Sequence, residues 1–256
     1  MAKTKSSVRE GHSIKSAKRV IEVFEFFAQR RSPATIGEIA KALDFPQSST
    51  SVLMKCLHDL KYMQRDAQQR TYQPTLRLAL TASWFCELQF SGSELTSLMT
   101  RLRDQTGGAV VLGIQNGIDL QYIQVVPALM PVQLVMRIGQ LRPLCRTAVG
   151  KALLAQHPDN KIVAIVQRIN ARTDGAERVQ IKKLMPELTQ IRRDGIAFSI
   201  NAASPGAAVI AAAVPVVSKQ NLPMAIGIGG PVDQIVPRRN AITDILRLEL
   251  QEIRPA

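Results

Sequence analysis

The sequence predicts an α+β protein in two parts, and three observations support this prediction. The chain has 256 residues, 46% of them hydrophobic, which suits two domains with packed cores. The first 75 residues have the pattern of three helices followed by a hairpin. The remainder has strands in hairpin-like order with helices grouped between them, which is typical of a domain around one antiparallel sheet.

The composition argues against several classes of protein. Cys56, Cys86 and Cys145 are far apart and form no CxxC pair, so we expect neither a disulfide framework nor a metal site, and no cofactor. The longest apolar run, residues 207–217, is too short to span a membrane, and the polar N-terminus lacks a signal peptide's apolar stretch. We therefore expect a cytoplasmic protein without a membrane partner.

The net charge of +13 is concentrated at the N-terminal end. Residues 1–75 contain 13 Lys and Arg against 7 Asp and Glu, nearly half of the excess on under a third of the chain. A compact basic module suits a polyanionic partner. On composition alone, a charge that only improves solubility is an equally good explanation.

The N-terminal elements follow from spacing and capping signals. Apolar side chains recur every three or four residues from Ser16, which predicts an amphipathic helix ending before Pro33. Thr35 and Glu38 have capping-box spacing and predict a second helix, residues 36–43. After a break at residues 44–46, a third helix is expected over residues 47–60, and alternating segments at 62–65 and 70–72 predict a hairpin. This order is that of a winged helix-turn-helix.

The third helix has two different faces on a helical wheel. Leu53, Leu57 and Leu60 define the expected buried stripe, and the opposite face is polar. Its side chains match known DNA contacts, because amides and hydroxyls pair with base edges and cations with phosphates. The alternative is an ordinary solvated helix. The residues that we expect to contact double-stranded DNA are Gln47, Ser48, Ser49, Ser51 and Lys55 on the helix, with Arg65 and Arg70 beside the hairpin tip.

The rest of the chain is expected to begin with a linker helix, residues 75–90, and a second helix, 94–105. The expected strands are residues 109–115, 120–126, 132–137, 196–200, 207–217 and 223–228. The expected helices are residues 147–156, 160–169, 177–193, kinked or split at Pro186, and 235–253.

The chain resembles the IclR family of bacterial transcriptional regulators. The N-terminal resemblance lies in Ile36-Gly37-Glu38-Ile39-Ala40, Phe45-Pro46, Ser48-Ser49, Leu57-His58-Asp59-Leu60 and Tyr72. In the second half it lies in residues 147–155, which are similar to the family's TA-x-GKA-LLA signature, and in residues 194–197, 210–214 and 228–231. Two departures are Val52, where many members have Arg, and Lys61, where Gly is common.

This resemblance implies a DNA-binding domain at residues 13–74, a linker helix at 75–90 and a GAF-like effector-binding domain at 91–256. It implies a homodimer or a dimer of dimers on a near-palindromic operator, controlled by a small-molecule effector, and no enzyme. The positions that the resemblance assigns to the effector are Ala148, Val149, Ser199, Asn201, Ala207, Val209, Gly227 and Gly229.

The chemistry of these positions suggests a particular ligand class. Ser199, Asn201, Val209 and the two glycines are less polar than the residues of members that bind keto-acids. We therefore expect a roomier pocket for a larger, more apolar effector, either an aromatic or a longer-chain carboxylate. The helix start near residue 147 suits a carboxylate, and Arg146 and Arg142 either assist it or lie on the surface.

Cys145 carries the rival interpretation. A thiol beside two arginines can have a lowered pKa, which would make the protein a redox-responsive regulator or a thiol enzyme. The alternative is that Cys145 is an unreactive residue packed in the core. Non-specific nucleic-acid binding is a further rival, although one Trp and three Tyr offer few surfaces for base stacking.

Overall fold

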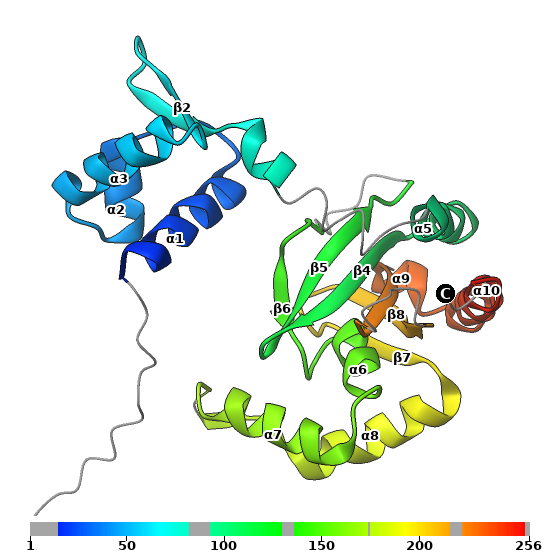
Figure 1. Cartoon of the computed structure of the whole chain (residues 1–256). Helices are drawn as coiled ribbons and strands as arrows, with labels where there is room; N and C mark the ends of the chain where they lie inside the picture. Colours follow the sequence, from blue (N-terminus) through cyan, green and yellow to red (C-terminus); the bar gives the residue numbers. More distant parts are fainter. Residues whose placement is uncertain (1–14, 82–92, 130–135, 174, 216–221, 254–256) are drawn as a thin grey trace, which may run out of the picture. The chain divides into compact units, whose positions relative to one another are not determined.

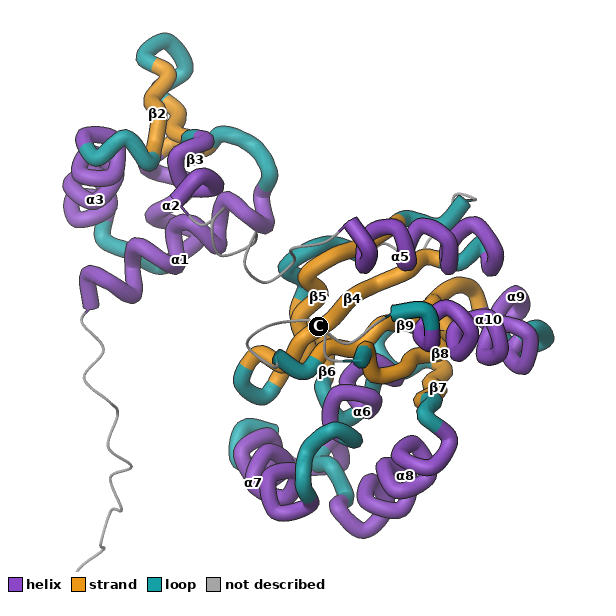
Figure 2. The backbone as a smooth tube through the Cα atoms, turned by 45° about the vertical axis from the view of Figure 1, so that its right-hand side comes forward, coloured by secondary structure: helices purple, strands orange, loops and turns teal. Residues whose placement is uncertain are grey.

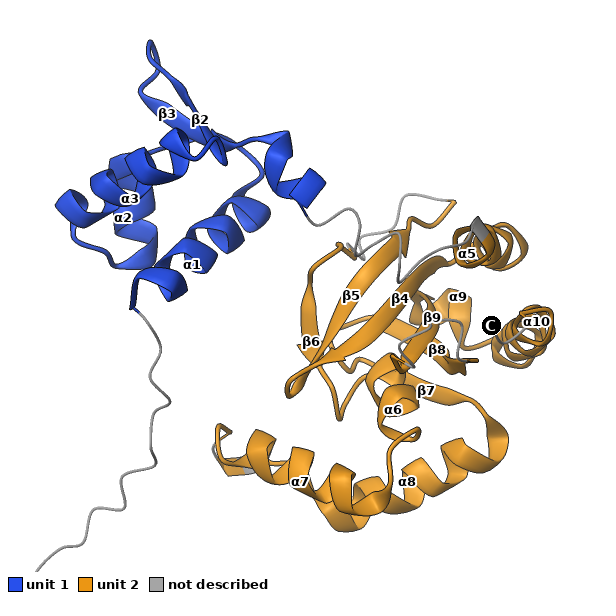
Figure 3. Ribbon diagram, in the orientation of Figure 1, with its two compact units in different colours: residues 1–86 blue, residues 87–256 orange. Residues whose placement is uncertain are grey.

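The computed structural model describes residues 15–81, 93–129, 136–173, 175–215 and 222–253. The chain divides into two compact units, residues 1–86 and 87–256 (Figure 3). The predicted α+β class is confirmed, since a helical unit with a small sheet precedes a unit built on a larger antiparallel sheet. No helix within the described ranges has the length and apolarity that crossing a membrane requires.

The N-terminal unit has the predicted three helices and hairpin. The helices are α1 (Lys15–Arg30), α2 (Ile36–Leu43) and α3 (Gln47–Asp59), and the hairpin strands are β2 (Met63–Asp66) and β3 (Thr71–Pro74). A two-residue strand that the sequence did not predict, β1 (Ala34–Thr35), pairs with β3 and gives the sheet order β1-β3-β2. Figure 1 shows the hairpin that begins with β2 projecting from the three helices. The sheet therefore ties the hairpin to the chain just before α2.

Local signals fix both ends of α2. The Thr35 hydroxyl accepts a hydrogen bond from the Glu38 N–H, while the Glu38 carboxylate accepts one from the Thr35 N–H, so the predicted capping box is present. The Thr35 N–H and the Arg30 guanidinium hold the pKa of Glu38 at about 2. Asp44 ends the helix in a left-handed conformation and turns the chain toward α3.

The turn into the hairpin places a lysine where the backbone favours glycine. Lys61 has φ = 66°, in the left-handed region. Its N–H donates to the His58 carbonyl and its own carbonyl accepts from the Thr75 hydroxyl, so hydrogen bonds on both sides hold the turn. Gly at this position is thus replaceable by Lys without loss of the hairpin.

The second unit contains a six-stranded antiparallel sheet of order β6-β5-β4-β9-β8-β7. Figure 2 shows the helices lying on its two sides. The strands are β4 (Ala109–Asn116), β5 (Asp119–Val126), β6 (Leu141–Pro143), β7 (Ala197–Ile200), β8 (Ala207–Val214) and β9 (Met224–Pro231). The helices are α5 (Ser93–Thr106), α6 (Ala148–Leu154), α7 (Asp159–Asn170), α8 (Ile181–Asp194), α9 (Val232–Ile235) and α10 (Arg239–Gln251), with a 3-10 turn, η1 (Gly175–Glu177).

Alternating side chains of the central strands fill two separate cores. On β4, Val111 packs in the core beneath α6, α7 and α8, whereas Val110 and Leu112 pack in the core beneath α5 and α10. The buried carboxylate of Glu249 on α10 accepts hydrogen bonds from Arg101 and Gln105 of α5, which joins these two helices. The sheet therefore separates an α6 side from an α5–α10 side.

Several predicted boundaries were wrong. The helix expected over residues 235–253 is split into α9 and α10, because Pro237 interrupts it. Pro186 neither splits α8 nor ends it, since only one hydrogen bond in the exposed first turns is lost. The short edge strand β6 was not predicted. Strand residues 132–135 and 216–217 and linker-helix residues 82–90 lie outside the described residues, although residues 76–81 are helical.

Candidate nucleic-acid interface and ligand cavity

The outer side of α3 is exposed, but the helix is rotated from the predicted orientation. Thr50, Met54 and Leu57 are buried, Leu53 is half-buried, and Leu60 is 54% exposed. The predicted stripe of Leu53, Leu57 and Leu60 was therefore wrong for Leu60. The predicted polar residues Gln47, Ser48, Ser51 and Lys55 are all exposed.

The rotation places two unpredicted side chains on the outer side of α3. Val52 is 70% exposed, and Cys56 is also exposed. The His58 ring is instead half-buried and its Nδ1 lies 3.1 Å from the Met63 carbonyl oxygen, so it helps to hold the hairpin against α3. The outer side of α3 therefore consists of short polar groups, one lysine and an aliphatic patch.

The start of α3 has the features of an anion site. Its N-cap residue is Pro46, which provides no side-chain cap for the first backbone N–H groups. Ser49 faces inward more than predicted, since its hydroxyl donates to the Pro46 carbonyl and accepts from Arg19 at 3.4 Å. Arg19 also lies over the Phe45 ring at 4.8 Å, which brings a cation that the sequence argument missed to this helix end.

The hairpin carries its two arginines on the surface. Arg65 lies on β2 opposite Tyr72 of β3, and Arg70 occupies a left-handed turn position immediately before β3. The Asp66 carboxylate accepts two backbone hydrogen bonds within the tip. The Asp66 carboxylate is therefore bonded within the hairpin tip, and both arginines are exposed.

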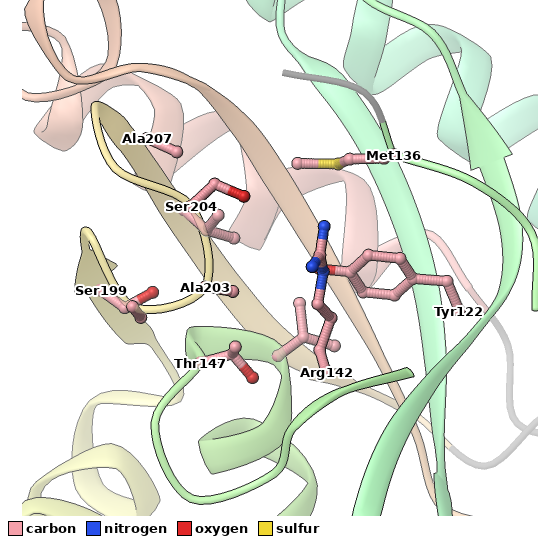
Figure 4. A pocket seen from close by; sticks show the side chains of 11 residues that line it. Tyr122, Met136, Arg142, Thr147, Ser199, Ala203, Ser204 and Ala207 are labelled. Carbon is pink, nitrogen blue, oxygen red and sulfur yellow. The ribbon is translucent and has the colours of Figure 1, made fainter. Parts of the chain in front are cut away.

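The second unit contains a cavity on the α6 side of its sheet (Figure 4). The cavity is narrow: it has about 20 Å³ of space for water-sized molecules and is partly open to solvent. Four residues from the predicted effector set line it: Val149, Ser199, Ala207 and Val209. The lining residues that were not in that set are Tyr122, Met136, Arg142, Thr147, Ala202, Ala203 and Ser204.

Hydrogen-bonding groups gather where α6 begins. The Ala148 N–H donates to the Ser199 hydroxyl at 3.0 Å, and the Gly150 N–H donates to the Thr147 hydroxyl at 3.2 Å. The N–H of the cavity-lining Val149 has no acceptor among the described residues. The Ser199 hydroxyl oxygen accepts the hydrogen bond from Ala148, so its O–H group can still donate one to a ligand. The two groups can therefore donate to an anion at the end of a helix.

Arg142 provides the charge in this cavity. Figure 4 places its guanidinium beside the Tyr122 ring, and it forms no ion pair with an acidic side chain of the described residues. Burial raises the pKa of Tyr122, and the positive charge of Arg142 opposes that increase. A cation without an anionic partner at the wall of a cavity can hold a carboxylate.

Five residues of the predicted effector set lie outside the cavity lining: Ala148, Asn201, Gly227, Gly229 and Arg146. Arg146 donates to the backbone carbonyl of Glu177 at 2.7 Å, away from the cavity that Arg142 lines. The Asn201 side chain accepts from the Gly206 N–H and closes the turn before β8. Ala148 is fully buried, and only its backbone reaches Ser199.

The glycines of β9 do not enlarge the cavity. A Cβ atom at Gly227 would stand 2.5 Å from Val149, and one at Gly229 would stand 2.6 Å from Met136. Val209 packs over both positions. The expectation of a roomier pocket at Gly227 and Gly229 was therefore wrong, because neighbouring side chains fill that space.

Cys145 does not have the environment of a reactive thiol. It is buried in the α6-side core, and burial raises its pKa to about 11, an effect that Lys151 and Arg146 only partly offset. The thiol is therefore protonated at neutral pH, contrary to the lowered pKa that the redox and thiol-enzyme interpretations require. Among the described residues no group of His, Cys, Asp and Glu could hold a metal ion.

Two family models match most of the chain. The model of the IclR helix-turn-helix domain matches residues 16–67, and the model of the bacterial transcriptional regulator IclR C-terminal domain matches residues 93–253.

Known proteins with the same organisation are similar over most of this length. The HTH-type transcriptional regulator XynR of Escherichia coli is 24% identical over 72% of this chain and 74% of its own. The HTH-type transcriptional repressor AllR of Salmonella paratyphi A is 24% identical over 86% and 81%. The crystal structure of an IclR homolog from Microbacterium hydrocarbonoxydans, complexed with 4-hydroxybenzoate, has a TM-score of 0.71 at 18% identity and covers 93% of this chain and 96% of that one.

Proposed function

Because the chain belongs to the IclR family of bacterial transcriptional regulators, we propose that α3 reads a specific operator and that a small carboxylate in the α6-side cavity controls this binding. The helix-turn-helix domain binds DNA and the C-terminal domain binds an effector. The operator, the effector class and the residues in contact with each are the proposed part.

The observation that carries the DNA-reading role is the exposed outer side of α3. Gln47 and Ser51 supply an amide and a hydroxyl for base edges, while Ser48, the uncapped helix start and Lys55 suit phosphates. Arg19, Arg65 and Arg70 extend the cationic surface to α1 and the hairpin. Ser49 is assigned to positioning Arg19, because its hydroxyl already bonds within the protein.

The same proposal includes a homodimer or a dimer of dimers acting in the cytoplasm. Two copies of α3 would enter successive major grooves of a near-palindromic site, about one helical turn apart. The effector would change the affinity for DNA only to the extent that it binds the DNA-competent and DNA-incompetent states differently.

The proposed effector is a carboxylate with an aromatic or other apolar body. The Val149 N–H, the Ser199 hydroxyl and Arg142 offer donors to a carboxylate, while Met136 and Val209 offer apolar contact to the rest of the molecule. The solved relative that is complexed with 4-hydroxybenzoate supports this class by analogy.

Substitutions on α3 and the hairpin test the DNA-reading role. Gln47→Ala or Ser51→Ala should reduce discrimination between operator and random DNA by about 1–3 kcal/mol, since each removes a base-edge contact. Lys55→Ala or Arg70→Ala should weaken binding to operator and random DNA alike, since each removes one phosphate contact. The slope of the logarithm of the binding constant against the logarithm of salt concentration should become shallower by about one unit. Fluorescence anisotropy at several salt concentrations measures both effects.

Lys161→Ala, on the exposed surface of α7, is the matched control and should leave both affinities unchanged. Equal losses on operator and random DNA for the Gln47 and Ser51 variants would remove these residues from the base-reading set.

Thermal unfolding with candidate ligands tests the effector class. At a ligand concentration of 100 Kd, binding raises the free energy of unfolding by about 2.7 kcal/mol. We expect 4-hydroxybenzoate or a related aromatic acid to raise the melting temperature. Stabilisation by pyruvate or glyoxylate, with none by aromatic acids, would refute an aromatic effector but would leave the DNA-reading role intact.

A further inference from the structure

The most exposed aliphatic side chain on α3 points to a further contact with DNA. Resting on the proposed function, we propose that Val52 reads the 5-methyl group of a thymine in the major groove. Val52 thereby becomes a residue that determines operator specificity, in addition to the polar residues of α3.

The position of Val52 on the helix supports this role. Val52 lies two residues from each of the buried residues Thr50 and Met54, which at about 100° per residue places it on the opposite side of α3. Its side chain is 70% exposed. An isolated exposed aliphatic residue is ordinary on a protein surface, so exposure alone assigns no role.

The residues around Val52 leave room for a base to contact its side chain. Ser48 and Cys56, one turn before and after it on the same side, are exposed and have short side chains. Val52 lines an open groove together with Arg19, Ser49 and Cys56, and its two methyl groups remain accessible there. Lys55 and the uncapped helix start lie on either side along the helix and can hold the phosphates that flank a base edge.

The chemistry of the groove then selects the partner. Valine has no hydrogen-bond donor or acceptor in its side chain, so it gains nothing from the polar edges of guanine, adenine or cytosine. The thymine methyl is the apolar group that base edges present in the major groove. A valine in the middle of the outer side of α3 consequently favours thymine at one position of each half-site.

Removing only the thymine methyl from the DNA gives a direct test. Operator duplexes are first selected from a random library with the full-length chain. Each thymine of a selected duplex is then replaced, one at a time, by deoxyuridine, which keeps the base pair and lacks the methyl group. Burial of one methyl group corresponds to about 0.8 kcal/mol, or about a fourfold change in affinity.

We expect one thymine in each half-site where deoxyuridine weakens wild-type binding about fourfold and barely affects Val52→Ala. Folding should not interfere, because Val52 is exposed and alanine favours helix. The matched control is Ile21→Ala, another exposed aliphatic residue but on α1, which should keep the full deoxyuridine effect.

The outcomes separate this assignment from the proposed function. If wild type and Val52→Ala lose the same affinity at every deoxyuridine, the thymine contact is refuted while operator reading stands. If the wild-type chain selects no sequence from the library, operator reading itself is refuted, and the assignment of Val52 with it.

Discussion

Replacing Arg142 by glutamine should strongly reduce the response to the effector. Arg142 is the cationic side chain of the cavity lining and forms no ion pair with a described acidic side chain, so a bound carboxylate loses a charge-assisted hydrogen bond in the variant. Such a bond contributes about 1.5–3 kcal/mol, which raises Kd roughly 10–100-fold. A ligand that stabilises the wild type by about 2.7 kcal/mol at 100 Kd should then add about 0.4 kcal/mol at the 100-fold limit.

Calorimetric unfolding with and without ligand measures this difference. Arg146→Gln is the matched control, because its side chain bonds to the Glu177 carbonyl and does not line the cavity. It should keep the whole ligand-induced shift. An Arg142→Gln protein that the ligand still stabilises as strongly as the wild type would contradict the assignment of Arg142.

A single methyl group at Gly150 should strongly destabilise the second unit. A Cβ atom there would stand 2.0 Å from the Leu144 carbonyl oxygen and 2.8 Å from the Thr147 hydroxyl oxygen. Since backbone occupies the space, α6 must move away from the chain that precedes it. We expect Gly150→Ala to lower the free energy of unfolding by about 3 kcal/mol and the melting temperature by about 6–12 °C.

Gly37→Ala is the matched control for Gly150→Ala. Gly37 also lies in the first turns of a helix, but a Cβ atom there would have no atom within 4 Å. This substitution should be neutral or stabilising by up to about 1 kcal/mol, because alanine favours helix. A Gly150→Ala protein that unfolds at the wild-type temperature would show that α6 does not pack as closely as described.

The helix-turn-helix was predictable because its signals are local. The capping box of Thr35 and Glu38 and the break before α3 each occupy a few consecutive residues, and the structure has both. The rotation of α3 was harder to predict. Leucines at 53, 57 and 60 and the set Thr50, Met54 and Leu57 both fit a helical period, and only packing against α1 and α2 chooses between them.

The cavity was less predictable because distant segments form it. Tyr122 comes from β5 and Arg142 from the adjacent β6, whereas Ser199 comes from β7 at the other end of the sheet, so only the folded domain brings them together. The predicted effector set included Arg146 and not Arg142, and only the tertiary structure shows that Arg142 lines the cavity while Arg146 bonds elsewhere. The sequence also does not show which side chain fills the space beside a glycine. At Gly229 that side chain is Met136.

The central claim is that the outer side of α3 enters a groove of duplex DNA, and the reactivity of Cys56 tests it most directly. Cys56 is exposed on that side, whereas Cys145 is buried with a pKa of about 11 and serves as an unreactive internal reference. Iodoacetamide modification of the full-length chain, followed by peptide mass spectrometry, reports the rate at Cys56 alone. We predict that saturating operator DNA slows this rate at least roughly tenfold, whereas an unchanged rate in the bound complex would contradict the claim.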